Sequence, residues 1–86
     1  MVAWRLRREL QAGPALLAVA QAFAEWEELL AGSLREHGAD PEEAEQLATL
    51  VVAAVEGTVA MCRAKRSTEP LDRTAEQLQR LIRAAL

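Results

Sequence analysis

The chain has almost none of the residues from which reactive sites are built. It holds one cysteine, Cys62, one histidine, His37, and three aromatic side chains in 86 residues. A single cysteine cannot form an internal disulfide, and a single histidine cannot supply the paired ligands of a typical zinc site. The sequence also lacks a glycine-rich phosphate loop, a nucleophile elbow and a histidine-based dyad. We therefore expect no catalytic residues, no cofactor and no bound metal.

A strong excess of charge is also missing. Ten basic and 13 acidic residues give a net charge of -3, which provides no general attraction to nucleic acid or anionic lipid. The basic cluster Arg5, Arg7 and Arg8 is too short to neutralise many phosphates. DNA contact by this chain alone is thus disfavoured. The lone cysteine and the absence of a secretory signal pattern indicate the cytoplasm.

One long apolar run is present, from Leu47 to Cys62, and a single charge at Glu56 interrupts it. This run is too apolar to leave one side in water, so it predicts a helix that is buried on both sides. A membrane span needs about 20 mainly apolar residues. Here Glu56 and Gly57 lie inside the run, and basic residues from Arg63 onwards end it. A centrally packed helix is the better interpretation.

Glycine and proline divide the chain into helices. Gly13-Pro14 starts a helix that should extend from residue 15 to about residue 37 and stop at Gly38. Asp40 and Pro41 predict the N-terminus of a second helix, which should end at Lys65 or Arg66. A break at residues 67–70 precedes a third amphipathic helix, with Ser67 or Thr68 as its cap. His37 is expected to interact with the carbonyl end of the first helix, and Cys62 to be an unreactive core thiol.

These patterns predict an all-α fold. We expect an antiparallel bundle of three main helices in residues 13–86, preceded by an arm or short helix in residues 1–12. With 51% hydrophobic residues and no disulfide, a chain of this length buries only part of its apolar surface. Oligomerisation is the remaining way to cover the rest.

A helical wheel divides the central helix into two faces. Larger residues gather on one face, which should meet the core of the chain: Ala44, Leu47, Val51, Ala54, Val55, Thr58 and Cys62. Small residues gather on the other: Ala53, Gly57, Ala60 and Ala64. Small residues at this spacing allow two helices to cross closely. We predict that this second face, together with Leu78 and Ile82 of the last helix, forms a two-fold, four-helix dimer seam.

The remaining candidate residues each allow two interpretations. Glu56 is expected at the rim of the helix or paired with an arginine, and otherwise in contact with a ligand. Phe23 and Trp26 share one helical stripe, which usually means core packing, whereas lining of a ligand cavity is the alternative. The carboxylates of Glu25, Glu27 and Glu28 are interpreted as a solvated face, although Glu27 falls within the apolar stripe, and the alternative for it is a pair with an arginine of a partner.

Several segments in order resemble the C-terminal domain of TetR-family transcriptional regulators, and are most similar to the LmrA/YxaF-like branch. The segments are Phe23–Leu34, Asp40–Ala44, Leu47–Val51, Val55–Gly57 and Arg63–Asp72. The resemblance covers about residues 14–86. It implies a helical regulatory domain that pairs with a second subunit through its last two helices. It also implies a pocket for a small apolar inducer, with Phe23, Trp26 and Leu30 as lining residues.

The chain also departs from that family, because a complete regulator of this kind is about twice as long and begins with a helix-turn-helix domain. We therefore expect a truncated regulator, consisting of its sensing and dimerising part. The alternative is a stand-alone helical interaction module that pairs with another helical protein and binds neither ligand nor DNA. In both cases a homodimer or a helical partner, and no membrane, is expected.

Overall fold

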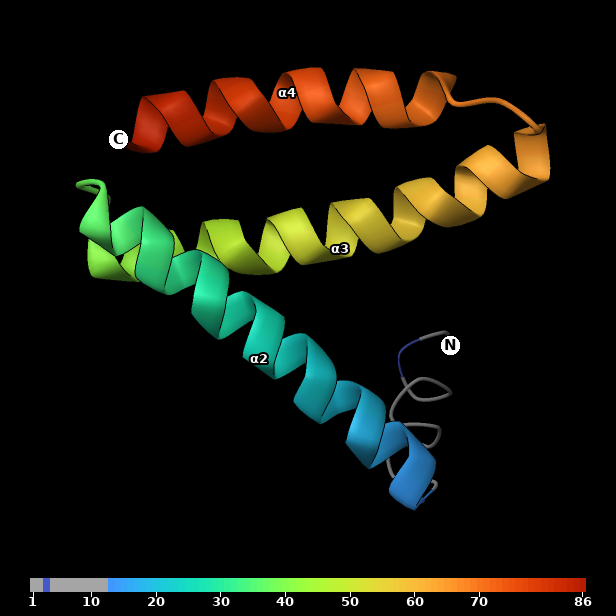
Figure 1. The fold of residues 1–86 in the computed structure, drawn as a ribbon, viewed down its shortest axis with the longest axis horizontal. Helices are drawn as coiled ribbons and strands as arrows, with labels where there is room; N and C mark the ends of the chain where they lie inside the picture. Colours follow the sequence, from blue (N-terminus) through green and yellow to red (C-terminus); the bar gives the residue numbers. More distant parts are fainter. Residues whose placement is uncertain (1–2, 4–12) are drawn as a thin grey trace.

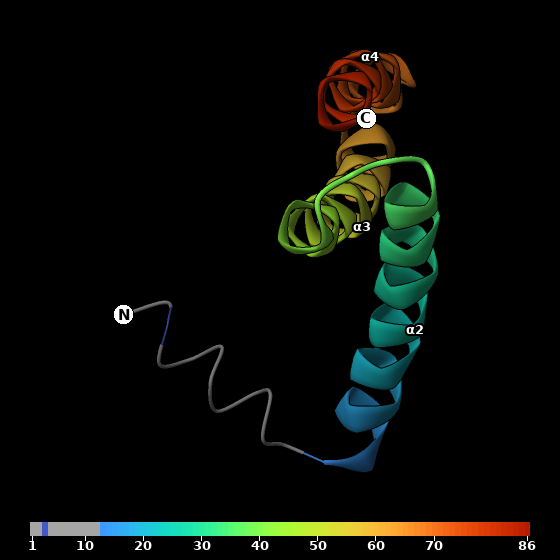
Figure 2. The same cartoon turned by 90° about the vertical axis from the view of Figure 1, so that its left-hand side faces the viewer.

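Helix α3 is the element on which the other two helices pack. The computed structural model describes residue 3 and residues 13–86. Residues 13–86 form α2 (Pro14–Glu36), α3 (Pro41–Lys65) and α4 (Glu69–Ala85). Helix α4 runs alongside α3 in the opposite direction, whereas α2 crosses the beginning of α3 and then diverges from it (Figure 1). Helices α2 and α4 do not pack against each other, and Figure 2 shows them on different sides of α3.

The all-α prediction is confirmed for the described residues, which contain no strand. The three helix ranges agree with those expected from glycine and proline to within one residue at most ends. The proposed arm in residues 1–12 lies outside the described residues, apart from residue 3. The prediction that α3 is buried on both sides does not hold within the single chain, because large apolar side chains such as Leu50, Val59 and Met61 are exposed on it.

The turn between α2 and α3 is closed by a regular C-terminal motif. Gly38 adopts a φ of 108°, which glycine reaches without strain. The amide of Ala39 donates to the carbonyl of Leu34 at 2.9 Å, and the amide of Gly38 donates to that of Arg35 at 3.1 Å. This is the Schellman arrangement, in which an apolar contact accompanies the hydrogen bonds. Ala39 and Leu34 are accordingly both buried.

Side chains complete both ends of this turn. The Nδ1 of His37 lies 2.7 Å from the carbonyl oxygen of Ser33. Because a carbonyl can only accept, the imidazole donates, which confirms the expected interaction with the helix end. Asp40 caps α3, since its Oδ2 accepts from the amide of Glu43 at 3.3 Å, as expected for an N-cap residue.

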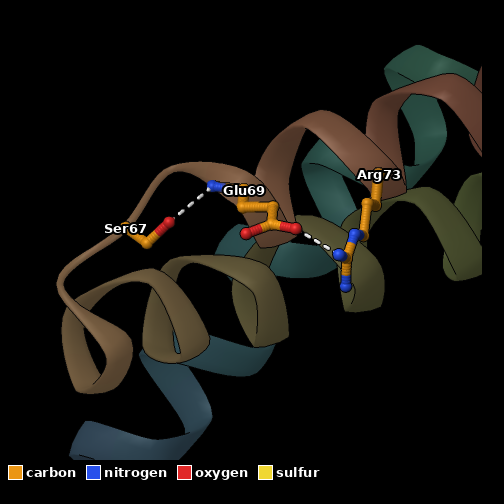
Figure 3. A network of polar contacts seen from close by, with 3 residues as sticks. All are labelled: Ser67, Glu69 and Arg73. Atoms are coloured by element: carbon orange, nitrogen blue, oxygen red, sulfur yellow. Dashed lines mark hydrogen bonds and ion pairs between the residues drawn. The ribbon is translucent and has the colours of Figure 1, made fainter.

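The turn between α3 and α4 uses a different residue for the same geometry. Arg66 adopts the left-handed conformation, with φ 51°, and the amide of Ser67 donates to the carbonyl of Cys62 at 3.1 Å. Of the two hydroxyl groups expected to cap α4, that of Ser67 accepts from the amide of Glu69 at 3.1 Å, whereas Thr68 makes no such bond. The carboxylate of Glu69 in turn pairs with Arg73 (Figure 3).

The core lies at one end of the molecule, where α2 ends, α3 begins and α4 ends. Its buried residues come from α2, α3 and the turn between them: Ala31, Leu34, Ala39, Ala44, Leu47 and Ala48. Leu30, Ile82 and Ala85 pack against this cluster. Ala44 and Ala48 are fully buried, because small side chains at i and i+4 let another helix approach closely. Away from this end α2 leaves α3, and its side chains from residue 14 to residue 22 are exposed.

Candidate functional site

The space between α2 and α3 holds an apolar groove of ≈ 320 Å³. The groove opens where α2 diverges from α3. Its lining residues are mostly apolar and come from both helices: Trp26, Leu29, Leu30, Val51, Val52, Val55 and Glu56. The groove results from the crossing of α2 and α3. The apolar residues of the two helices are in contact near the crossing, but farther along they are too far apart to touch.

A second groove of ≈ 350 Å³ lies beside the first on the same side of α3. Val52 and Glu56 belong to both, and the second groove adds Phe23, Glu27, Thr49 and Ala53. The ring of Phe23 meets the ring of Trp26 edge to face, with centroids 5.9 Å apart and planes at 76°, a favoured arrangement for aromatic pairs. This pair stands at the boundary between the two grooves.

The three residues predicted to line a pocket therefore all lie at these grooves. Trp26 and Leu30 line the first and Phe23 lines the second. Trp26 is 51% exposed, so packing in the core, which the stripe pattern also allowed, does not describe its environment in this chain. Sequence reasoning missed the opposite wall, formed by Val51, Val52 and Val55. The sequence analysis assigned the whole larger face of α3 to the core. It could not distinguish the residues of that face that α2 covers from those that α2 leaves exposed.

Acidic groups provide the polar part of the grooves. The Oε1 of Glu27 accepts a hydrogen bond from the hydroxyl of Thr49 at 2.5 Å, which joins α2 to α3. Glu27 is half-buried, unlike Glu28, which pairs with Arg35 at 3.4 Å on the solvated side of α2. Glu56 is exposed, and no described residue forms an ion pair with it. The expectation of a rim position thus agrees with the structure, and the arginine pair is not seen among the described residues.

The two faces predicted for α3 differ in burial. On the larger face, Ala44, Leu47 and Thr58 are buried, while Val51, Ala54 and Cys62 are half-buried and Val55 is exposed. Thr58 donates from its hydroxyl to that of Thr74 on α4 at 3.1 Å, which satisfies a buried polar group. The predicted small-residue positions Ala53, Gly57, Ala60 and Ala64 are all exposed. Within the described chain the larger face is thus the more buried of the two, and Ala53 of the small-residue face lies at the edge of the second groove.

The candidate seam residues of α4 have another environment. Leu78 and Ile82 are half-buried, and Ile82 packs against the core of its own chain. Two apolar residues of α3 that the small-residue pattern did not include, Leu50 and Met61, are exposed. They recur with Ala53, Gly57 and Ala64 at steps of three or four, so the five lie on one side of the helix. The spacing is visible in the sequence, but the predicted face included only its small residues.

Comparison with known proteins assigns the chain to a family. Residues 2–77 match the family model described as the C-terminal domain of LmrA/YxaF-like transcriptional regulators. This chain belongs to that family of TetR-type regulators. It is 33% identical over 73 residues to uncharacterised helix-turn-helix-type transcriptional regulators of two Mycobacterium tuberculosis strains, CDC 1551 / Oshkosh and ATCC 25618 / H37Rv. The alignment covers 85% of this chain but only 38% of each relative. No solved structure matches.

Helix α3 is unusually apolar for a helix with exposed sides. By length and composition alone, α3 is apolar enough to cross a membrane. A helix that is covered by protein inside a helical domain has the same composition. Within the described chain, 22% of the most apolar window is buried.

Proposed function

We propose that this chain is the regulatory and dimerisation domain of a TetR-like transcriptional repressor, acts in the cytoplasm and senses a small apolar effector. The dimer would position DNA-binding heads that these residues do not include. The observation that carries the proposal is the exposed apolar side of α3, which we name the α3 stripe: Leu50, Ala53, Gly57, Met61 and Ala64.

The α3 stripe fits a second helix better than it fits water. Its members repeat every three or four residues, the spacing that forms a continuous seam between two helices. Large side chains, Leu50 and Met61, stand on both sides of the smallest residue, Gly57. A second copy of α3 that crosses near Gly57 would bury this seam in an isologous contact. The predicted Ala60, Leu78 and Ile82 would contribute at its margins.

Gly57 itself supports a close crossing. No described residue lies within 4 Å of the position that a Cβ at residue 57 would occupy, so the packing of residues 13–86 does not require glycine there. Glycine inside a helix costs about 1 kcal/mol relative to alanine. A partner helix whose backbone approaches at this point provides the physical reason for that cost.

The grooves support the sensing part of the proposal. Binding pockets for small molecules commonly enclose about 300–1,000 Å³ and are mostly apolar with few polar groups. The first groove, at ≈ 320 Å³, matches this description. An effector that fills it would touch α2 and α3 together, and α3 also carries the proposed dimer seam. A change in the angle between these helices could therefore reach the seam.

Light scattering at micromolar concentration tests the dimer. The wild-type chain should have the mass of two copies, and Gly57→Leu should reduce it to one, because the added side chain prevents the close crossing. Ala20→Leu is the matched control, since Ala20 is exposed on α2 and lies outside the α3 stripe. A folded wild-type monomer, or an unchanged Gly57→Leu dimer, would contradict the proposed interface.

A thermal-shift screen with small apolar compounds tests the sensing. A ligand that binds the folded chain raises its melting temperature by mass action, and Val52→Trp, whose larger side chain would fill the space at the position shared by the two grooves, should abolish the shift. A dimer that no compound stabilises would favour the alternative, a helical interaction module without a ligand. In that case the α3 stripe would serve pairing alone.

A further inference from the structure

We propose that the grooves select an amphipathic organic cation, whose charged group is held by Glu56 and the ring of Trp26 while its apolar body lies against Leu29, Leu30 and the valines of α3. This inference rests on the proposed sensing function, because it assigns the chemical class of the effector. It follows from the charges and the aromatic ring that line the grooves, and it separates such a cation from neutral and anionic compounds of the same size.

The charges of both grooves have one sign. Among the described residues, Glu56 is the only ionisable one that lines the first groove, and Glu56 and Glu27 are the only ones that line the second. No lysine, arginine or histidine of residues 13–86 lines either groove. Within the described chain Glu56 has no ion-pair partner. A positive ligand group therefore meets a carboxylate whose charge the described residues leave uncompensated.

The two carboxylates have different hydrogen-bond environments. One oxygen of Glu27 already accepts from the hydroxyl of Thr49, which holds the side chain between α2 and α3. Glu56 makes no side-chain hydrogen bond within the described residues. Glu56 is consequently the group that can move towards a ligand and pair with it. Glu27 adds a second, fixed negative charge in the adjacent groove.

Trp26 provides the second element of cation recognition. Its ring is half exposed and lines the same groove as Glu56. Cations are attracted to the face of an aromatic ring, most strongly to that of tryptophan. The rest of the lining, Leu29, Leu30 and the three valines, favours an apolar body. An anion would gain the apolar contacts but would be repelled by both carboxylates.

Three aromatic probes of similar size test the proposal: naphthylmethylamine, which is a cation at pH 7, neutral naphthylmethanol and anionic naphthoate. Equilibrium dialysis against the full chain gives the three dissociation constants. The cation should bind about fivefold more tightly than the neutral probe, as expected for a partly solvated ion pair, and naphthoate should bind weakest. The preference should decrease with added salt, since the carboxylate of Glu56 is exposed.

Glu56→Gln should remove the preference and leave the affinity for naphthylmethanol unchanged. Glu25→Gln removes the same charge from an exposed residue that lines neither groove, and it should keep the preference. Equal binding of cation and neutral probe to the wild-type chain would overturn the inference and leave apolar sensing intact. Binding of none of the three probes would overturn both the inference and the sensing function. A preference that persists in Glu56→Gln would contradict the role of Glu56.

Discussion

The two ends of α3 differ in how their apolar residues are covered. At its beginning, α3 is covered by the end of α2 and, on a different side, by the end of α4, and Leu47 is 8% exposed beside the fully buried Ala44 and Ala48. We name this the packed end. Beyond Gly57, α2 has diverged from α3, and apolar side chains such as Val59 and Met61 are 40% and 47% exposed. We name this the open end.

This difference indicates that one helix performs two tasks. At the packed end small residues bring the helices of one chain together, so the chain alone satisfies them. At the open end the apolar character is similar, but the described chain supplies a cover only on the side of α4. We propose that two partners cover the apolar surface that α2 and α4 leave exposed on α3: an effector in the grooves, which lie before Gly57, and a second copy on the α3 stripe.

The largest difference in the free energy of unfolding should be seen between alanine variants of a buried and an exposed leucine of α3. Leu47→Ala removes a side chain that is 8% exposed, and it should lower the free energy of unfolding by about 3 kcal/mol through lost burial and a cavity. Leu50→Ala, at 45% exposure, should cost the single chain about 1 kcal/mol or less and mainly weaken self-association. Urea denaturation at several protein concentrations separates the two effects. Equal losses for both variants would remove the distinction.

Replacing an alanine of α3 by leucine should give the next largest difference in stability between a buried and an exposed position. Ala48→Leu forces a larger side chain into a fully buried position and should destabilise the chain by about 2 kcal/mol. Ala53→Leu adds the same atoms at an exposed position of the α3 stripe and should leave the fold intact. Thermal denaturation followed by circular dichroism measures both. A stable Ala48→Leu variant would mean that the packed end is looser than its burial indicates.

Loss of a helix cap should have a moderate effect at both ends. Asp40→Ala removes the side chain that accepts from the amide of Glu43 and should cost about 1 kcal/mol. Ser67→Ala removes the corresponding bond to Glu69, and we expect about 0.5 kcal/mol because this turn lies away from the core. Hydrogen exchange of the amides that follow each cap would report local fraying. Greater fraying after Ser67→Ala at unchanged global stability would support the comparison, whereas global destabilisation by Ser67→Ala would argue against it.

The smallest effect should be a gain in stability. Arg66 holds a left-handed conformation, which costs a residue with a side chain about 1–2 kcal/mol relative to its preferred region. Arg66→Gly should therefore stabilise the chain by about 0.5 kcal/mol, after allowance for the greater freedom of glycine when unfolded. Gly38→Ala at the packed end should destabilise the chain, because alanine reaches a positive φ only with strain. Both changes can be read from urea midpoints, and stabilisation by both would show that the turns are not held as described.

The sequence predicted the helix ends well because each has a local cause. Pro14, Asp40 and Gly38 act through backbone geometry and hydrogen bonds to neighbouring residues, which do not depend on the rest of the fold. The left-handed residue after α3 was not foreseen, since Arg66 has no intrinsic preference for that conformation. There the hydrogen bonds of the turn determine the backbone.

The candidate site was predicted only in part. Helical spacing indicates which residues share a face, and the small-residue positions of α3 are exposed. It favoured core packing for Trp26, whereas this side chain is 51% exposed and lines a groove. Helical spacing cannot give the point at which two helices separate, because the crossing depends on how the end of α2 packs in the core that also holds Ala44 and Ala48 and on the turn at Gly38. The groove and the exposed Trp26 both result from that crossing.

Disulfide cross-linking at residue 57 tests the central claim most directly. With Cys62→Ser to remove the native thiol, Gly57→Cys should form a disulfide between two copies under mild oxidation, because the bond requires Cα atoms about 4.4–6.8 Å apart. Ala20→Cys in the same background should remain monomeric on a non-reducing gel. A chain that dimerises in solution but does not cross-link at residue 57, or that cross-links equally at residue 20, would contradict the claim that a second α3 covers the α3 stripe.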